Sequence, residues 1–324
     1  MDFTWVDGER LIRFGEPALD EASGLLASRG FGGFALLTTR RAAASAPALA
    51  SDADVVVDVA PGPVPDAAAR AREEAGGRPL VALGGGRVID SAKAIAGADG
   101  LRCAAVPTTL SGAEMTPFHR MPAGVEELKL VRPALVVAVP SLMVSQPMPA
   151  LAASAMNALA HAVEALYTPM ANPVSELTAL RAIESIASGL RDVEPERPRL
   201  ALGALLAGYA SGVAGFAVHH AVCQTIVRVA GTPHAQTNAV MLPHVCRFME
   251  PRAPEPMRLA GNALAGRDVA DLAVMAGVTR LSELGFEESR VGEVVSAALQ
   301  HPAIGNTPGP PREEELTALV RGAL

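Results

Sequence analysis

The first 150 residues alternate apolar runs with amphipathic ones, and this alternation restricts the fold more than any other feature of the chain. Short continuous apolar runs bounded by turn residues are typical of strands buried on both faces of a parallel sheet. The segments between them, such as residues 16–30 and 65–77, have the composition of crossover helices. The predicted strands cover residues 10–14, 34–39, 54–59, 79–86, 102–109 and 134–140. The N-terminal part is therefore predicted to be an α/β domain with a parallel sheet.

Strand signals stop after Pro149, and long runs rich in Ala and Leu continue to the C-terminus. Prolines and charged clusters interrupt these runs, as expected where helices end. The chain has 324 residues, which exceeds the usual size of one hydrophobic core. Aromatic residues make up only 3% of it, which favours helices packed through small side chains. We predict an α/β domain over residues 1–150 and an all-helical (all-α) domain over residues 151–324.

Composition and charge argue against several classes of partner. The net charge is −7, and Lys and Arg are scattered, which disfavours a nucleic-acid surface. Residues 200–227 contain no Asp, Glu, Lys or Arg and are long enough to span a bilayer, but their four glycines and paired histidines favour a protein core around a polar site. The single cysteines predict free thiols, and no signal peptide is recognised at the N-terminus. We predict a cytoplasmic protein that binds a small molecule, with neither nucleic acid nor membrane as partner.

A glycine-rich segment, LGGGRVIDSAKAIA at residues 83–96, joins a predicted strand to a helix predicted to begin near Val88. Gly84, Gly85 and Gly86 would let backbone amides approach a pyrophosphate at the helix N-terminus. The order of strand, glycines and helix favours a dinucleotide site over a plain tight turn. Asp90 would either accept a hydrogen bond from the cofactor or stabilise the helix start.

Threonines at the ends of two predicted strands extend this predicted cofactor site. Thr38 lies near the end of the strand at 34–39, and Thr108 and Thr109 end the strand at 102–109. Ligands of parallel α/β sheets bind at the carboxyl ends of the strands. Thr108 and Thr109 would therefore face the cofactor or cap the turn that follows.

Imidazoles and amides recur at helical spacing in the second half of the chain. Asn157 and His161 are four residues apart, as are His220 and Gln224, so that each pair lies on one helix face. Taken singly, each histidine is more readily explained as a hydrogen-bonded core residue. Together, however, His161, His220 and His234 supply three neutral imidazoles. With one oxygen donor they form a catalytic arrangement for Zn²⁺ or Fe²⁺.

His234 follows Thr232, a predicted N-cap, and Pro233, a predicted first helical residue, so it would lie at a helix start. A metal there would polarise a carbonyl group and allow hydride to pass from a reduced nicotinamide to the carbonyl carbon. Gln224 occupies a natural position for a proton relay, but an amide cannot titrate.

In these segments the chain resembles the iron-containing (group III) alcohol dehydrogenase family, and especially its maleylacetate reductase branch, within the dehydroquinate synthase-like superfamily. The resemblance also covers RLIRFG, VPTTLSGAEMTP, MNALAHAVEALY and TPGPPREEELTALV. It implies a dinucleotide-binding N-terminal domain, a helical C-terminal domain, a cleft between them for NAD(P)H and substrate, and a homodimer. By position it implies metal ligands at Asn157, His161, His220 and His234, and catalytic roles for His220, His234 and Gln224.

Several positions depart from the family pattern. Asn157 stands where the alcohol dehydrogenases have Asp, although maleylacetate reductases commonly have Asn, and the loss of a carboxylate lowers the expected metal affinity. Gln224 stands where the family usually has His, and Arg87 replaces a Ser in the phosphate loop. Gly309 replaces an Arg of the reductases, and glycine cannot bind a substrate carboxylate. The sequence therefore supports the reaction class more strongly than maleylacetate as the substrate.

We therefore predict an NAD(P)H-dependent reductase of maleylacetate or a related oxo acid or activated carbonyl, with metal polarisation by Fe²⁺ or Zn²⁺ as an option. The alternative is a divergent family member with a non-redox, lyase-like or ligand-binding role, because of Asn157, Gln224 and Arg87.

Overall fold

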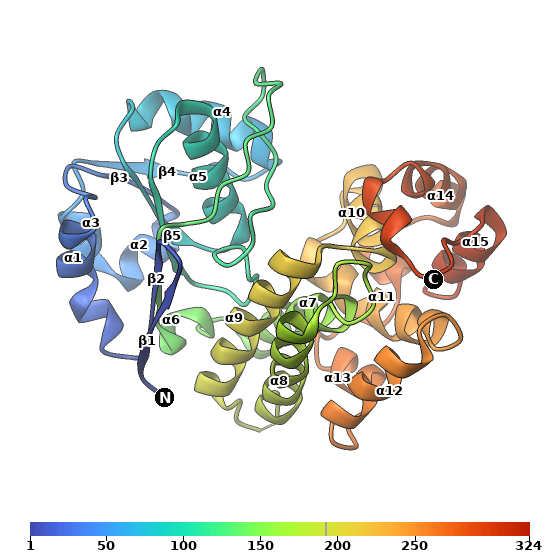
Figure 1. Ribbon diagram of the computed structural model, residues 1–324. Helices are drawn as coiled ribbons and strands as arrows, with labels where there is room; N and C mark the ends of the chain where they lie inside the picture. Colours follow the sequence, from blue (N-terminus) through green and yellow to red (C-terminus); the bar gives the residue numbers. More distant parts are fainter. Residues whose placement is uncertain (192) are drawn as a thin grey trace. The chain divides into compact units, whose positions relative to one another are not determined.

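The computed structural model describes residues 1–191 and 193–324. The chain forms two compact units, Met1–Ser145 and Gln146–Leu324, and each is described by itself. Figure 1 shows the sheet and its helices in the first unit and the helices of the second.

The first unit is built on a seven-stranded sheet. Its elements in chain order are β1 (Phe3–Asp7), β2 (Arg10–Phe14), α1 (Ala18–Ser28), β3 (Ala35–Thr38), α2 (Arg40–Ser45), α3 (Pro47–Ser51), β4 (Val55–Asp58), α4 (Val64–Ala75), β5 (Leu80–Gly84), α5 (Gly86–Asp99), β6 (Cys103–Pro107), β7 (Leu135–Ala138) and α6 (Pro140–Met143).

The strand order is β1-β2-β7-β6-β5-β3-β4. Only β1 runs antiparallel to its neighbour β2; the other pairs are parallel. The predicted α/β class with a parallel sheet is confirmed. β1 was not predicted, because its residues alternate between half-buried and exposed and form no continuous apolar run.

Both faces of the sheet are covered by helices, which explains the continuous apolar runs of its strands. In β5, Leu80 and Ala82 pack with α4 and α5, whereas Val81 and Leu83 pack with α1, α2 and α3. The alternation of side chains along a strand sends successive residues to opposite layers. The result is a helix–sheet–helix arrangement.

The strand order reverses between β3 and β5. From β3 the chain continues outward to β4, whereas from β5 it continues in the other direction through β6 to β7. The hydroxyl of Thr38, at the end of β3, donates to the carbonyl oxygen of Leu83 on β5 at 2.9 Å. This bond ties together the carboxyl ends of the two strands at the switch point, where open α/β sheets bind ligands.

The second unit is helical, and no strand occurs in residues 146–191 and 193–324. Its elements are α7 (Met148–Glu164), α8 (Pro173–Gly189), α9 (Arg197–Ala214), α10 (Val218–Ala230), α11 (His234–Met249), α12 (Pro254–Ala263), α13 (Val269–Val274), α14 (Val291–Leu299), α15 (Glu313–Arg321) and the 3₁₀ turns η1 (Leu281–Leu284), η2 (Glu288–Arg290) and η3 (Pro302–Asn306). α7 is its most buried helix: every residue from Leu151 to Glu164 is buried.

Small residues allow α8 and α9 to approach closely. A Cβ atom added to Gly203 of α9 would lie 2.7 Å from Ile186 Cγ1 and 3.2 Å from the carbonyl oxygen of Ala182, both on α8. Such a contact cannot be relieved by moving only the tip of a flexible side chain.

We expect Gly203→Val to destabilise the protein by about 1–3 kcal/mol, because the added atoms overpack the contact between α8 and α9. Gly261→Val is the matched control, since a Cβ on this helical glycine of α12 meets nothing within 4 Å. Thermal unfolding of both variants measures the difference, and equal melting temperatures would contradict this account of the helix contact.

Among the described residues, no single helix is long and apolar enough to cross a membrane. α9 and α10 meet the length and composition criteria only as a pair, with a bend of 101° between them.

Candidate functional site

The glycine-rich loop lies at the carboxyl end of β5, where α5 begins. α5 starts at Gly86, two residues before the predicted position, and Gly85 is its N-cap. No acidic residue lies in its first turn, so the partial positive charge of the helix N-terminus is not neutralised there. Arg87 is exposed. A helix start of this kind at the switch point of the sheet suits a phosphate group.

The loop glycines are required by close packing, since none of them has a positive φ. An added Cβ would lie 2.7 Å from Val88 Cβ at Gly84, 2.9 Å from Thr109 Cγ2 at Gly85, and 3.2 Å from Ser111 Cβ at Gly86. Side chains therefore fill one side of the loop, and only glycine lets the backbone lie against them.

The structure brings the predicted cofactor-binding residues to one edge of the sheet. Thr108 donates its backbone N–H to the carbonyl oxygen of Gly84 at 2.9 Å, so the end of β6 lies against the loop. The Thr38 hydroxyl is buried and used within the sheet. Asp90 lies beyond the first turn of α5 and pairs with Lys93 at 2.8 Å, so its carboxylate is engaged within the helix. Contact of these residues with a cofactor stays a prediction.

Lys93 is fully buried and holds the segment after β6 in place. Its Nζ donates to the carbonyl oxygens of Ala113 at 2.9 Å, Thr116 at 3.2 Å and Phe118 at 2.7 Å. Glu114 lies in the same segment, also fully buried, and neither carboxylate oxygen has a hydrogen-bond partner within the described part of the chain. Burial raises the pKa of Glu114 from 4.5 to about 7, against the opposing effects of Lys93 and Arg10.

We expect Glu114→Gln to stabilise the protein at pH 8 and to have little effect near pH 5. Between pH 4.5 and about 7 the folded chain keeps a proton on Glu114 that the unfolded chain has released, so stability falls as pH rises. The shift corresponds to about 3 kcal/mol. Melting temperatures between pH 5 and pH 8 measure the effect, with Glu73→Gln on the exposed face of α4 as control. A difference between variant and wild type that stays constant with pH would refute the assignment to Glu114.

In the second unit, a buried carboxylate orients the imidazole of His220. Glu164 Oε2 lies 2.5 Å from His220 Nδ1, and its Oε1 accepts the backbone N–H groups of His219 at 2.8 Å and His220 at 3.4 Å. Glu164 follows His161 by three residues on α7, so both lie on one helix face. Glu164 was not predicted from the sequence, although a lone carboxylate in an apolar helix was the available signal.

Burial determines the protonation of this group. It raises the pKa of Glu164 to about 7 and lowers the pKa values of His219 and His220 to about 3. The imidazoles are therefore neutral at neutral pH. With Glu164 ionised, the ring proton of His220 lies on Nδ1, and Nε2 carries a lone pair.

His161 and Asn157 lie beside His220. The rings of His161 and His220 stack with their centroids 4.3 Å apart. The ring of Phe216 also stacks on His220, with a centroid distance of 4.4 Å. Asn157 Nδ2 lies 3.3 Å from His161 Nε2. Asn157 Oδ1 and His220 Nε2 are buried and have no hydrogen-bond partner among the described residues.

His234 is held through Asn238. Asn238 donates to the carbonyl oxygen of His234 at 2.8 Å, and its Oδ1 lies 2.8 Å from His219 Nε2. His234 is the first residue of α11, which confirms its predicted position at a helix start. The predicted N-cap was wrong: Pro233 takes the cap position, and the Thr232 hydroxyl instead pairs with that of Thr237 at 2.8 Å.

Gln224 lies one turn after His220 on α10. It contacts His301, which was not predicted to belong to the site. His301 Nε2 lies 3.3 Å from Gln224 Oε1. The two residues are 77 positions apart, so no local pattern could have paired them.

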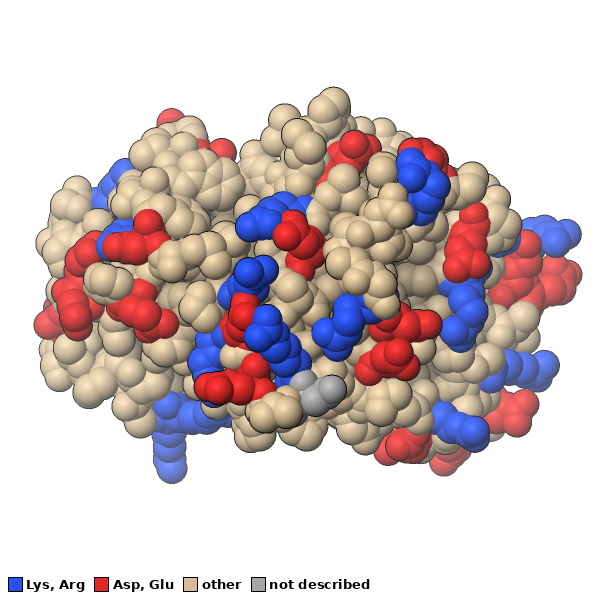
Figure 2. All heavy atoms as spheres, turned by 90° about the horizontal axis from the view of Figure 1, so that it is seen from below, with Lys and Arg blue, Asp and Glu red and all other residues tan. Residues whose placement is uncertain are grey.

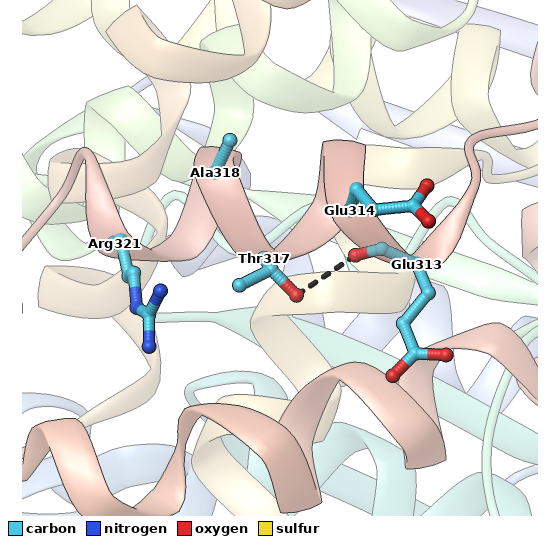
Figure 3. A pocket seen from close by; sticks show the side chains of 5 residues that line it. All are labelled: Glu313, Glu314, Thr317, Ala318 and Arg321. Atoms are coloured by element: carbon cyan, nitrogen blue, oxygen red, sulfur yellow. Dashed lines mark hydrogen bonds between the residues drawn. The ribbon is translucent and has the colours of Figure 1, made fainter.

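A surface pocket of about 640 Å³ lies along α15, lined by Glu313, Glu314, Thr317, Ala318 and Arg321 (Figure 3). It contains none of the predicted site residues, and its Thr317 hydroxyl is bonded to the backbone of Glu313. On the face shown in Figure 2, basic and acidic side chains are interspersed and do not form a region of one sign.

Comparison with known proteins gives the family. The model of the Fe-containing alcohol dehydrogenase family, C-terminal, matches residues 151–324, and that of iron-containing alcohol dehydrogenase matches residues 10–138. The chain belongs to the iron-containing alcohol dehydrogenase family. Family membership confirms the predicted resemblance, and the enzyme is an NAD(P)H-dependent oxidoreductase; the non-redox alternative is not favoured.

Relatives and solved structures agree with this family. The chain is 37% identical to maleylacetate reductase 1 of Rhodococcus opacus, over 69% of this chain and 67% of the relative. It is 34% identical to the maleylacetate reductase of Sphingobium indicum, over 80% and 77%. The crystal structure of maleylacetate reductase from Rhizobium sp. strain MTP-10005 superposes with a TM-score of 0.86 at 28% identity, covering 100% of this chain and 98% of that one.

The family implies iron, and the second unit offers donors for it. His220 Nε2 and Asn157 Oδ1 are buried polar atoms that lack partners, and a carboxylate bonded to the other nitrogen of a ligating histidine is the usual outer-shell arrangement. Among the described residues, however, no group of three or more His, Cys, Asp and Glu side chains is placed to hold one ion. The donors present fit a divalent ion in chemistry, since imidazole nitrogens and an amide oxygen are ligands of Fe²⁺.

Proposed function

We propose that this oxidoreductase reduces maleylacetate, or a closely related oxo acid, with NADH or NADPH as hydride donor. The observation that carries the proposal is the buried bond between Glu164 and His220, which leaves a neutral imidazole with its Nε2 lone pair available. The maleylacetate reductases among the relatives support the choice of substrate.

The residues of the second unit that would hold a divalent iron are Asn157, His161, His220 and His234. When bound, such an ion would supply Lewis-acid polarisation of the substrate carbonyl. Glu164 fixes the ring of His220, and Asn238 Nδ2 lies 3.4 Å from His234 Nε2. The buried, largely apolar α7 and α10 exclude water, which strengthens each polar contact made there.

The first unit supplies the dinucleotide site in this proposal. The N-terminus of α5 and the backbone of Gly84, Gly85 and Gly86 would bind the pyrophosphate. Thr38, Thr108 and Thr109 border the same edge of the sheet. Hydride transfer then requires the nicotinamide to reach the carbonyl carbon of the substrate.

The test is oxidation of NADH and NADPH with maleylacetate and with a panel of oxo acids, together with anaerobic metal analysis of the purified protein. We expect oxidation of at least one cofactor with maleylacetate or with another oxo acid of the panel. No oxidation of either cofactor by folded protein with any of these substrates would overturn the proposal.

The proposal extends to a homodimer in the cytoplasm, with an oxo acid or another carbonyl compound as substrate. The free cysteines, of which Cys103 and Cys223 are buried, suit a reducing compartment. Light scattering of the purified protein tests the dimer, and a mass near 33.3 kDa would contradict it.

A further inference from the structure

The backbone defines the tautomer of His301. His301 immediately precedes η3 and acts as its N-cap: its Nδ1 accepts the backbone N–H of Ala303 at 3.2 Å. A backbone amide can only donate, so Nδ1 must carry the lone pair. In the neutral ring the proton therefore lies on Nε2.

The tautomer of His301 in turn defines the orientation of the Gln224 amide. His301 Nε2 is a donor, and its partner at 3.3 Å is Gln224 Oε1. The amide oxygen of Gln224 therefore faces His301, and its NH₂ group is turned away from that ring. Gln224 is partly exposed, and the His301 contact is made by its oxygen alone, so the hydrogens of the NH₂ group are open to solvent or to a ligand.

The segment that carries His301 is anchored beside His220. Asn306, at the end of η3, donates to the carbonyl oxygen of Phe216 at 2.8 Å, and the Phe216 ring stacks on His220. Ala303 and Ile304 of η3 are buried.

We propose that Gln224 donates an amide N–H to the carbonyl oxygen of the substrate, and that His301 is the positioning residue that turns the amide for this contact. This inference rests on the proposed reductase function. It explains how Gln can stand where the family usually has His: the position supplies a hydrogen-bond donor and not a titrating group.

The reaction balances without a proton from Gln224. Hydride from the reduced nicotinamide forms the new C–H bond, and the π electron pair of the carbonyl moves to oxygen. The Gln224 N–H bond stabilises the negative charge that develops there. A proton from solvent water completes the hydroxyl group, and the amide keeps both its hydrogens.

Two variants separate the donor from its positioning residue. Gln224→Glu keeps the size and still accepts from His301, but it lacks the NH₂ group, and we expect kcat to fall about 100-fold. His301→Asn keeps a good N-cap for η3 but cannot reach Gln224, and we expect kcat to fall about tenfold. Cofactor binding should not change in either.

A double-mutant cycle tests that His301 acts through Gln224. If it does, His301→Asn has no further effect on kcat in a Gln224→Ala background. An equal tenfold loss in both backgrounds would show an independent structural role and overturn the inference, as would a wild-type kcat in Gln224→Glu. The Gln224→Glu variant leaves the N-cap of η3 unchanged, so its kcat tests the role of Gln224 even if His301→Asn fails to fold.

The wild-type protein separates the two levels of the proposal. Absence of turnover in the wild type overturns the reductase function and with it this inference. Wild-type turnover with variants that do not respond overturns only the roles of Gln224 and His301.

Discussion

Glu164→Gln is expected to lower kcat/KM by up to about 100-fold, the range found when outer-shell partners of ligating histidines are removed. Glu164 Oε1 accepts two backbone N–H groups, so the single oxygen of Gln would take that place. The new NH₂ group would then face His220 Nδ1 and donate to it. The ring proton of His220 would move to Nε2, and the lone pair on which the site depends would be lost.

Two measurements check this prediction. Steady-state kinetics give kcat/KM, and ¹⁵N NMR of the histidine rings reports which nitrogen of His220 carries the proton. The control is Glu184→Gln, which changes an exposed carboxylate of α8 that is paired with Arg181 at 2.6 Å. Loss of activity with an unchanged His220 tautomer would contradict the positioning role, and so would full activity with an inverted one.

Strands could be predicted from the sequence most readily where helices cover both faces of the sheet. The strands β3, β5, β6 and β7 are buried along their whole length between two helical layers, so their residues are mostly apolar on both faces and stand out in the sequence. β1 escaped prediction because its residues alternate between half-buried and exposed, whereas β4, the other edge strand, carries a continuous run of valines.

The candidate site could be predicted only where its residues share a helix. The spacing of four placed Asn157 with His161, and His220 with Gln224, on common faces, because helical periodicity is a local property. Partners that come from distant segments give no such signal. Glu164 and His220 are 56 residues apart, and Gln224 and His301 are 77 apart.

Tertiary contacts determine the geometry at the loop glycines and at Thr232, where the local sequence pattern suggested another role. The sequence predicted that the loop glycines serve a phosphate, but their immediate requirement is the packing of Val88, Thr109 and Ser111. Thr232 had the composition of an N-cap, yet its hydroxyl found a buried partner in Thr237 instead. In both cases a tertiary contact, absent from any local pattern, decides the geometry.

Gly85→Val is expected to weaken NADH and NADPH binding about 100-fold, which corresponds to about 2.7 kcal/mol. Gly85 has φ −82° and ψ −174°, values that any residue adopts, so backbone strain does not contribute. The effect is steric: the Cβ would lie 2.9 Å from Thr109 Cγ2 and 3.2 Å from its Oγ1, and the two methyl groups would push the loop away from the helix start. Fluorescence titration gives the dissociation constants.

The steric origin can be tested against a general loss of stability. Gly24→Val introduces the same side chain into α1, where a Cβ meets nothing within 4 Å, and it should leave cofactor affinity unchanged. Thr109→Ala should recover part of the affinity lost in a Gly85→Ala variant, because it removes the group that the new Cβ meets. Full affinity in Gly85→Val would show that the dinucleotide does not use this loop, whereas a loss that Thr109→Ala cannot relieve would place the phosphate itself against the glycine.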